Sequence, residues 1–441
     1  MKAHLIPIYF ESAQDPDFTR QLQLLREVLA EDALLLEPAE LGENLSTADA
    51  VIFPQMLGNA YRRLEDIRAI RLPILVVTSE FGSMSMWDWE INAFLAAEGV
   101  NVVAPYNLEQ TRSVCRALAL RRELSRSRFL VFQDNPGEGF QPEIFKRFYW
   151  WENACTQTIF DRFGVEILRR SFKELAQAAQ EIPDHQAQSV WEKWKDRLHL
   201  GKISQRALFS AIKIYLAVSR ALDEDPQIQA VGINCLNESH FSDTTPCLAW
   251  NMLFEERELI WGCEADTLSM LTKLLLYRVF KTPVMMTNLY PFLMGQAALK
   301  HEHIPNFPEM PEAPENYVLT AHCGYLGVVP QSFATDWKLQ PKVLAIVDDN
   351  ATAIDACLPT GSITMVKLDS SLKKISVVPG ELVGYAQFPN SHCLNGAIIR
   401  VNDGHQLMSR LLSHHYVLAT GDLLPGIRQV ASIFDLSVEV I

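Results

Sequence analysis

Short apolar runs alternate with amphipathic stretches over the first 125 residues. The runs have the length of β-strands and cover 3–10, 32–37, 48–54, 72–80 and 100–106. Helix-like stretches lie between and after them, at 16–30, 57–69 and 107–125. Strands joined by helical crossovers form a parallel sheet that is covered by helices. The pattern therefore predicts a Rossmann-like or flavodoxin-like domain over 1–125, although the GxGxxG motif of dinucleotide sites does not follow its first strand.

A second α/β pattern begins near residue 126. SRFLVFQD (127–134), QIQAVGIN (227–234) and ELIWGCEAD (258–266) are strand-like runs, and a helix-rich stretch fills the space between the first two. TLSMLTKLLLYRVF (267–280) is typical of a helix, and PVMMTN (283–288) follows as a further strand of this unit. We therefore predict a second doubly wound parallel-sheet domain over 126–305.

The pattern changes after the proline-rich stretch that ends near residue 316. Strand-like runs now follow one another closely, separated by Gly, Pro, Asn and Asp: YVLTAHC, KVLAIVDD, SITMVKLD, KISVVPGELV and CLNGAIIRV. Close spacing of this kind favours antiparallel pairing. A strand at 415–422 and a helix at 423–436 belong to the last part of the chain. The expected architecture is α/β, with two parallel-sheet domains followed by a mostly antiparallel, barrel-like domain over 306–441.

Composition and charge exclude several classes of protein. Of the 441 residues, 39 are basic and 53 acidic, which gives a formal net charge of −14. Nucleic-acid binders and proteins that bind anionic membranes need basic surface, so neither kind of partner is expected. No apolar run approaches the roughly 20 residues that span a bilayer. The start of the chain is typical of a first strand and not of a signal peptide. The eight cysteines lack CxxC spacing, which favours free thiols in a cytoplasmic protein.

Candidate chemistry lies where the predicted strands end. Ligands of open parallel sheets bind beyond the carboxyl ends of the strands. That rule selects Glu238, the pair Glu264 and Asp266, and Asn288, and the later strands add three histidines, His322, His414 and His415. Carboxylates and neutral imidazoles together suit a borderline divalent ion such as Mn²⁺ or Co²⁺.

Structural roles remain open for the same residues. Acids in the first turn of a helix are stabilised by the helix N-terminus, which would explain Glu264 and Asp266 without a ligand. His322 lies in an apolar strand, where a histidine is ordinarily part of the core. Of the adjacent His414 and His415, only one is expected to face inward, because side chains alternate along a strand.

Six segments, in this order, resemble the L-fucose isomerase and L-arabinose isomerase superfamily, and above all its fucose-isomerase-like branch. The segments are GINCLNE, TPCLAW, WGCEADTLSMLTKLLL, PVMMTN, TAHCG and SHHYVLATGDL. The resemblance is good over roughly 227–441 and weaker over 1–226. The CEAD element followed by an amphipathic helix is its most specific part, and the HHYV element with its following GD is the next.

The resemblance implies an enzyme that interconverts an aldose and a ketose with the help of Mn²⁺. Its substrate would be a pentose or 6-deoxyhexose such as L-fucose or L-arabinose, and a proton would pass between C1 and C2 through a cis-enediol. Homotrimers or hexamers are usual in the family. Carried over by position, the expected metal ligands are Glu264, Asn288, His322 and His415. The candidates for proton transfer are Glu264, Glu238 and Asp266, and Asn237, Asn288 and His414 are expected to contact the sugar.

One position departs from the family pattern. The family has an aspartate where this chain has Asn288, and no Asp or Glu lies between 267 and 301. An asparagine oxygen can coordinate a cation, but it cannot take up a proton at neutral pH. Three hypotheses follow: an isomerase in which another residue moves the proton, a homologue that binds metal and sugar without turnover, or a lyase or epimerase on the same scaffold.

Overall fold

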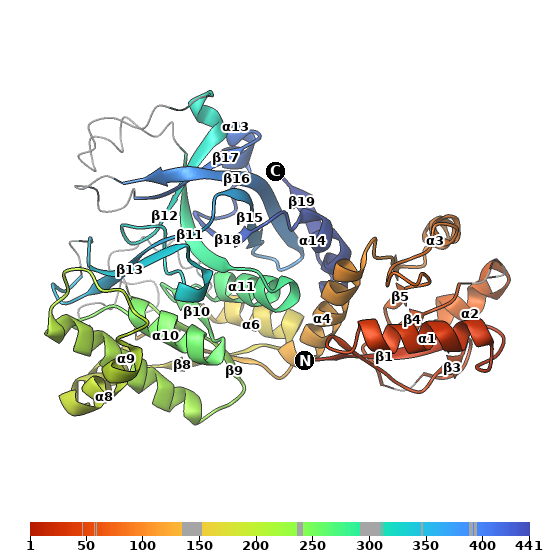
Figure 1. Ribbon diagram of the computed structural model, residues 1–441, viewed down its shortest axis with the longest axis horizontal. Helices are drawn as coiled ribbons and strands as arrows, with labels where there is room; N and C mark the ends of the chain where they lie inside the picture. Colours follow the sequence, from red (N-terminus) through yellow and green to blue (C-terminus); the bar gives the residue numbers. More distant parts are fainter. Residues whose placement is uncertain are drawn as a thin grey trace. The chain divides into compact units, whose positions relative to one another are not determined.

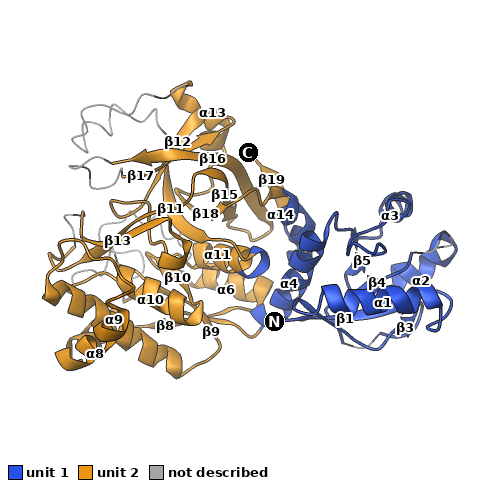
Figure 2. Ribbon diagram, viewed as in Figure 1, with its two compact units in different colours: residues 1–125, 278–280, 425–436 blue, residues 126–277, 281–424, 437–441 orange. Residues whose placement is uncertain are grey.

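The computed structural model divides into two compact units (Figures 1 and 2). It describes residues 1–45, 47–56, 58, 60–134, 152–235, 241–291, 310, 312–344, 347–387, 391 and 395–441. Unit 1 consists of 1–125, 278–280 and 425–436, and unit 2 of 126–277, 281–424 and 437–441. The chain therefore leaves and re-enters both units, and neither is one continuous segment.

Unit 1 is built on a parallel sheet. Its strands run in the order β2-β1-β4-β5-β6, with β3 also pairing β1. The strands are β1 (Ala3–Tyr9), β2 (Ala33–Leu35), β3 (Ala39–Glu40), β4 (Ala50–Phe53), β5 (Ile74–Val76) and β6 (Val102–Val103). The helices are α1 (Pro16–Val28), η1 (Ala60–Arg63), α2 (Leu64–Ala69), α3 (Asp88–Ala97) and α4 (Leu108–Leu124). Strands β4 and β5 are both buried along their whole length, as expected for a sheet covered on both faces.

Unit 2 contains a second parallel sheet, in the order β10-β9-β7-β8. Its strands are β7 (Arg128–Phe132), β8 (Glu166–Arg170), β9 (Ile228–Ile233) and β10 (Ile260–Cys263). The helices of this part are α6 (Asn153–Phe163), α7 (Phe172–Gln180), α8 (Asp184–Trp194), α9 (Gln205–Asp223), α10 (Cys247–Arg257) and α11 (Thr267–Phe280). Strand β10 ends at the CEAD segment, which therefore lies at the carboxyl edge of this sheet.

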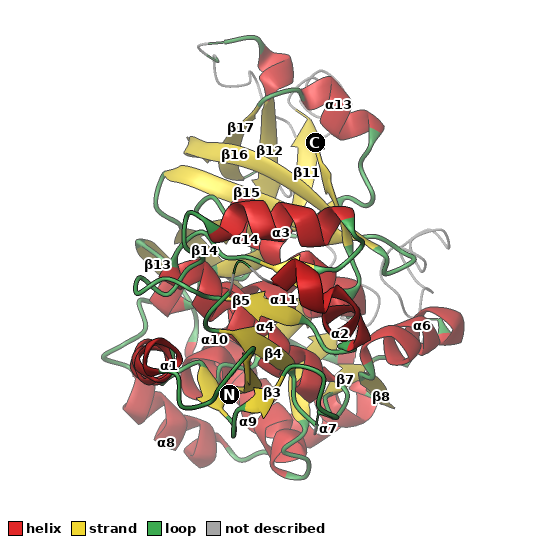
Figure 3. Cartoon of the chain, turned by 90° about the vertical axis from the view of Figure 1, so that its right-hand side faces the viewer, coloured by secondary structure: helices red, strands yellow, loops and turns green. Residues whose placement is uncertain are grey.

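A closed antiparallel barrel of six strands follows in the described part of unit 2. Its strands pair in the ring β15-β18-β11-β12-β17-β16, which closes through the pairing of β16 with β15, and β19 adds a parallel strand to β16. Figure 3 labels the barrel strands β11, β12, β15, β16 and β17. The strands are β11 (Val284–Pro291), β12 (Tyr317–Ala321), β15 (Gly361–Leu368), β16 (Lys374–Ala386), β17 (Gly396–Val401), β18 (His415–Thr420) and β19 (Ser437–Val440). Gly396 permits the close β12–β17 approach, since a Cβ there would lie 2.0 Å from the Thr320 carbonyl oxygen.

The remaining elements are short. They are the hairpin β13 (Asp336–Pro341) and β14 (Thr352–Cys357), the helices α13 (Gly404–Ser409) and α14 (Leu424–Val430), and the 3₁₀ turns η4 (Pro314–Asn316), η5 (Gln331–Phe333) and η6 (Ala431–Phe434). No helix in the described ranges combines the length and the hydropathy that crossing a bilayer requires.

The fold confirms the predicted α/β class and the antiparallel barrel near the end of the chain. Two details of the sequence prediction are wrong. The run 283–288 does not continue the parallel sheet, because β11 pairs antiparallel with β12 and β18. The run KVLAIVDD is not a strand over its described residues, because the chain turns there between β13 and β14, with Asn350 N–H donating to Asp348 Oδ1 at 2.8 Å. The division into three domains stays a prediction.

Candidate metal centre

Three side chains meet in the interior of unit 2 as a group that could hold a metal ion. Glu264, His322 and His415 are 3%, 2% and 0% exposed, and one ligand atom of each lies within 4.8 Å of the others. Glu264 Oε1 is 3.4 Å from His322 Nε2 and 3.8 Å from His415 Nε2. One carboxylate oxygen and two imidazole nitrogens are a suitable donor set for Mn²⁺, Co²⁺ or Zn²⁺.

Glu264 lies at a strained junction between β10 and α11. Its φ is +53° and that of Ala265 is +54°, in the left-handed region that residues with a Cβ seldom adopt. The turn is held by two backbone bonds, from Ala265 N–H to the Ile233 carbonyl (3.0 Å) and from Asp266 N–H to the Cys263 carbonyl (3.1 Å). Backbone strain of this kind is concentrated at functional sites. Here it turns the Glu264 carboxylate toward the histidines of the barrel.

The two histidines come from barrel strands on either side of β11. His322 follows β12 in a tight turn, in which its N–H donates to the Tyr325 carbonyl at 2.6 Å. His415 begins β18. Asn288 of β11 is in register with both Ala321 and His415, so the amide side chain belongs to the strand between the two imidazoles. The barrel thus supplies the nitrogen ligands, and the parallel sheet supplies the carboxylate.

Asp266 positions His415. As the N-cap of α11, it accepts through Oδ1 from Ser269 N–H at 2.8 Å. Its Oδ2 is 3.0 Å from His415 Nδ1, 3.2 Å from Lys367 Nζ and 2.7 Å from Ser269 Oγ. A carboxylate that binds one imidazole nitrogen leaves the other directed at a metal, and this is the usual outer-shell arrangement of histidine ligands. Asp266 therefore orients His415 and is not itself part of the metal-binding group.

Electrostatics keep the carboxylates of this region ionised. Burial raises the pKa of Glu264, but the charge of His415 and the polar contacts of the carboxylate with the His322 and His415 rings outweigh it and hold that pKa well below its usual value. Burial likewise opposes the effect of Lys367 and His415 on Asp266, whose pKa is lowered. His415 has a raised pKa, because Glu264 and Asp266 outweigh its own desolvation. Glu264 is thus a preformed anionic ligand at neutral pH.

Two buried polar atoms at the centre fit a cation. His322 Nε2 and Asn288 Oδ1 have no hydrogen-bond partner among the described residues. The Asn288 Nδ2 group donates to Tyr290 Oη at 3.0 Å, which leaves the amide oxygen as the available atom. Buried acceptors without a partner are rare in folded proteins and call for a water, an ion or a ligand. The residues present therefore fit a divalent ion held by Glu264, His322 and His415, with Asn288 as a further oxygen donor.

The remaining predicted site residues are His414, Asn237 and Glu238. His414 lies beside His415, with ring centroids 4.3 Å apart, but it is not in the metal-binding group. Burial and the neighbouring charge of His415 lower its pKa to about 3, so its ring is neutral at physiological pH. Asn237 and Glu238 lie outside the described residues. Sequence reasoning missed Lys367, although a single lysine within the apolar run SITMVKLD was a usable signal.

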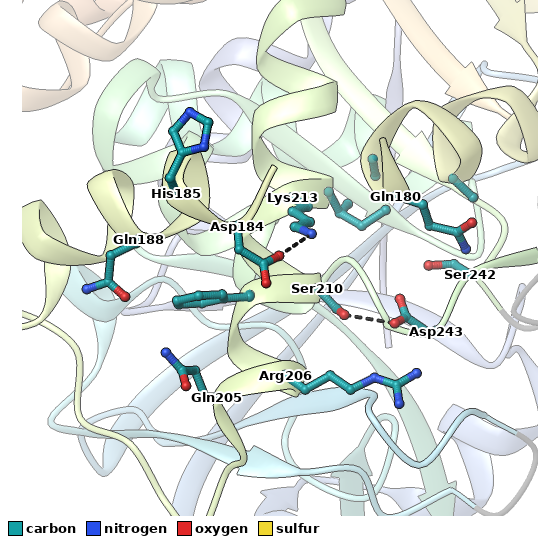
Figure 4. A pocket seen from close by; sticks show the side chains of 14 residues that line it. Gln180, Asp184, His185, Gln188, Gln205, Arg206, Ser210, Lys213, Ser242 and Asp243 are labelled. Atoms are coloured by element: carbon teal, nitrogen blue, oxygen red, sulfur yellow. Dashed lines mark hydrogen bonds and ion pairs between the residues drawn. The ribbon is translucent and has the colours of Figure 1, made fainter. Parts of the chain in front are cut away.

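A separate cleft lies elsewhere in unit 2, with a volume of about 910 Å³. It is lined by residues of α7, α8 and α9 together with Ser242 and Asp243 (Figure 4). Its charged groups include Asp184, which pairs with Lys213 at 2.6 Å, and Asp243, which accepts from Ser210 at 2.8 Å (Figure 4). None of the predicted site residues that the structure describes lines it. The metal-binding group, and not this cleft, is therefore the better candidate site.

Comparisons with known proteins add no family to this picture. Neither a scan against protein-family models nor a search of curated proteins returns a match for this chain. Function is therefore inferred from the site residues and from the resemblance of the six segments.

Proposed function

We propose that this protein is a metal-dependent aldose–ketose isomerase acting on a pentose or 6-deoxyhexose, such as L-arabinose or L-fucose. The observation that carries the proposal is the buried group of Glu264, His322 and His415, at the positions that the resemblance selects. Carboxylate and imidazole ligands support Mn²⁺ as the ion. When bound, such an ion polarises a substrate carbonyl and stabilises the negative charge that develops on its oxygen.

The residues of the centre would divide the work. Glu264, His322 and His415 would hold the ion, and Asp266 would keep His415 in the tautomer that offers Nε2. Asp266 is a positioning residue in this scheme, because its two oxygens already accept from Ser269, Lys367 and His415. It has no exposed surface and no oxygen left for substrate.

Proton transfer between C1 and C2 needs a titratable group within hydrogen-bond reach of the sugar. Asn288 cannot serve, because an amide does not take up a proton at neutral pH. Glu264 is the carboxylate of the described site that remains for this role. Glu238, from the segment after β9, is the second candidate. A proton moved by one of these groups would convert the aldose to the ketose through a cis-enediol.

A second function is favoured by Asn288 itself. With an amide where the family has its second carboxylate, the centre would bind metal and sugar but leave the sugar unchanged. This alternative predicts the same metal ligands and the same binding of sugar, and it differs only in turnover.

The resemblance also supports a homo-oligomer, a trimer or a hexamer, and the cysteine pattern supports a cytoplasmic location. Light scattering coupled to gel filtration tests the oligomeric state, and a monomer in solution would contradict that part of the proposal.

The test combines metal-dependent stability with product analysis. Protein stripped with chelator is titrated with Mn²⁺, Co²⁺ and Zn²⁺ while its Tm is measured, for the wild type, Glu264→Gln and the exposed control Glu174→Gln. The metal-loaded proteins are then incubated with an aldose panel in deuterated water and followed by NMR. Isomerisation by the wild type and the control, lost in Glu264→Gln, is the expected result. Stabilisation by metal and sugar without turnover would favour the binding protein. Absence of both would overturn both functions.

A further inference from the structure

Four cysteines from distant parts of the chain line one small cavity in unit 2. Of the seven cysteines within the described ranges, these are Cys235, Cys247, Cys263 and Cys323, and all four are free thiols. Cys235 follows β9, Cys247 is the first residue of α10, Cys263 ends β10, and Cys323 comes shortly after β12. No spacing motif joins them in the sequence, so it is the fold that brings them to one cavity.

The cavity has room for a single ion. Its volume is about 20 Å³, which suffices for one water-sized particle and excludes an organic substrate. Val343, Leu344 and Val347 form part of its aliphatic wall. Thr352 also lines it, is 1% exposed, and has a hydroxyl oxygen, Oγ1, without a hydrogen-bond partner among the described residues. A buried water needs about three hydrogen bonds, which these walls supply poorly, whereas sulfur is the preferred ligand of soft metal ions.

Cys235 and Cys247 are the thiols best placed to act as ligands. Cys263 and Cys323 each adjoin a residue of the proposed metal centre, and Cys323 Sγ lies 2.9 Å from His322 Nδ1. Cys247 lies in the first turn of α10, where the N–H groups of the helix start stabilise a thiolate. Burial raises the pKa of Cys235 to about 12, with contributions from the charges of a neighbouring carboxylate and of Cys247. Burial raises the pKa of Cys247 to about 11. Both are therefore neutral thiols at pH 7, and a soft ion must displace their protons to bind.

We propose that Cys235 and Cys247 bind a monovalent thiophilic cation, of the class of Cu⁺ and Ag⁺, at a second metal site. Within the described part of the chain, three His, Cys or carboxylate ligand atoms lie within reach of one another only at Glu264, His322 and His415. The thiol cavity is therefore unsuited to Zn²⁺, which takes four ligands in structural sites, and suited to an ion that two sulfur atoms satisfy. Cu⁺ and Ag⁺ form linear complexes with two thiolates, and soft sulfur ligands select such ions. This site is independent of the proposed isomerase.

The charges of such a complex balance at the cavity. Each thiol loses its proton as its sulfur bonds to the ion, so M⁺ and two neutral thiols yield [M(SR)₂]⁻ and two protons. Lys342 also lines the cavity, and its Nζ pairs with Asp349 Oδ1 at 2.9 Å. The Asp349 side chain is 98% exposed, and an ion pair so open to water is weak. The Lys342 ammonium is thus a counter-charge for the single negative charge of the complex.

The test uses Ag⁺ as the probe, because it binds thiolates without a change of oxidation state. Reduced protein in chloride-free buffer near neutral pH is titrated with silver nitrate by calorimetry. Two buffers of different ionisation enthalpy give the stoichiometry together with the number of protons released. The test variants are Cys235→Ala and Cys247→Ala. Cys115→Ala is the matched control: Cys115 is buried on α4, burial raises its pKa to about 12 as well, and it does not line the cavity.

We expect the wild type and Cys115→Ala to bind one Ag⁺ tightly with release of two protons, and both test variants to lose that binding. Should Cys235→Ala fail to fold, Cys247→Ala decides. Glu264→Gln should still bind the ion, and the test variants should keep their Tm response to Mn²⁺.

Three results would overturn the inference. Equal tight binding in the test variants, or no tight binding by the wild type, would show that these thiols are only core side chains. Release of one proton per ion would show binding by single cysteines. Loss of Ag⁺ binding in Glu264→Gln would place the ion at the proposed metal centre. Tight Ag⁺ binding with two protons released, but without any response to Mn²⁺, would instead refute the proposed metal enzyme and leave the thiol site standing.

Discussion

Lys273 on α11 is a buried cation whose removal should stabilise the protein. Its side chain is 0% exposed, and its Nζ has no hydrogen-bond partner among the described residues. The ammonium lies 3.8 Å from the centre of the Trp261 ring. Burial lowers the pKa of Lys273 to about 7, against the opposing influence of Cys263 and Asp266. The group therefore titrates near neutrality, far below an exposed lysine.

The size of the effect follows from this pKa. A fall from 10.5 to about 7 corresponds to a penalty of about 5 kcal/mol for holding the charge inside, at about 1.4 kcal/mol for each tenfold change in proton affinity. The cation–π contact with Trp261 offsets about 2 kcal/mol of that penalty. Lys273→Met keeps an unbranched side chain against the ring and removes the charge. We expect it to raise the free energy of unfolding by about 3 kcal/mol near pH 7.

The sign of the pH dependence distinguishes this explanation from simple repacking. Between pH 7 and about 10, the unfolded state holds a proton on Lys273 that the folded state has lost, so the wild type gains stability as the pH rises. The advantage of Lys273→Met should be greatest at pH 7 and below and should shrink toward zero near pH 10. Urea unfolding of both proteins at pH 7, 8.5 and 10, followed by circular dichroism, measures it. A destabilised variant, or a difference that does not change with pH, would refute the reasoning.

Three further variants test the supports of the metal centre. Asp266→Asn should weaken Mn²⁺ binding 10- to 100-fold, because His415 loses its carboxylate partner, as a titration of the Tm would show. The same change should lower stability by about 3–5 kcal/mol by leaving Lys367 buried without a counter-charge; unchanged urea midpoints would contradict this. Adding Lys367→Met to that variant should restore most of the stability but not the affinity for Mn²⁺. Gly232→Ala places a Cβ 3.1 Å from the Ala265 Cα. It should lower the free energy of unfolding by about 1–3 kcal/mol and weaken Mn²⁺ binding. Wild-type values in both assays would count against this prediction.

Much of the fold was predictable because its signals are local. Alternation of apolar runs and helical stretches predicts parallel sheets, and closely spaced runs with turn residues predict the antiparallel barrel. The run 283–288 was assigned to the wrong sheet because a fully apolar run is compatible with any buried strand. Its partners, β12 and β18, are distant in sequence, and nothing within PVMMTN distinguishes parallel from antiparallel pairing.

The candidate site, like the fold, could be predicted only where its signals are local in the sequence. Residue types at strand ends indicated Glu264. For Asp266, stabilisation by the start of a helix was the alternative explanation, and the structure shows Asp266 as the N-cap of α11. The meeting of His322 with Glu264 depends on how the barrel packs on the sheet, which spacing in the sequence does not contain. Asn234 lies at a strand end, where an asparagine is common in turns, so its position in the sequence does not mark it. Its complete burial, with no side-chain hydrogen bond to any described residue, is visible only in the structure.

The origin of the ligands in two sheets has a kinetic consequence. Glu264 comes from the parallel sheet, and His322 and His415 come from barrel strands much later in the chain. Their donor atoms converge only after both sheets have formed, so contacts at the centre should be absent from the transition state for folding. Stabilising contacts that form after the barrier slow unfolding and leave the folding rate nearly unchanged. A bound ion would then slow unfolding and leave the rate of folding nearly unchanged. In stopped-flow experiments, Mn²⁺ should lower the unfolding rates of the chevron and hardly change the refolding rates.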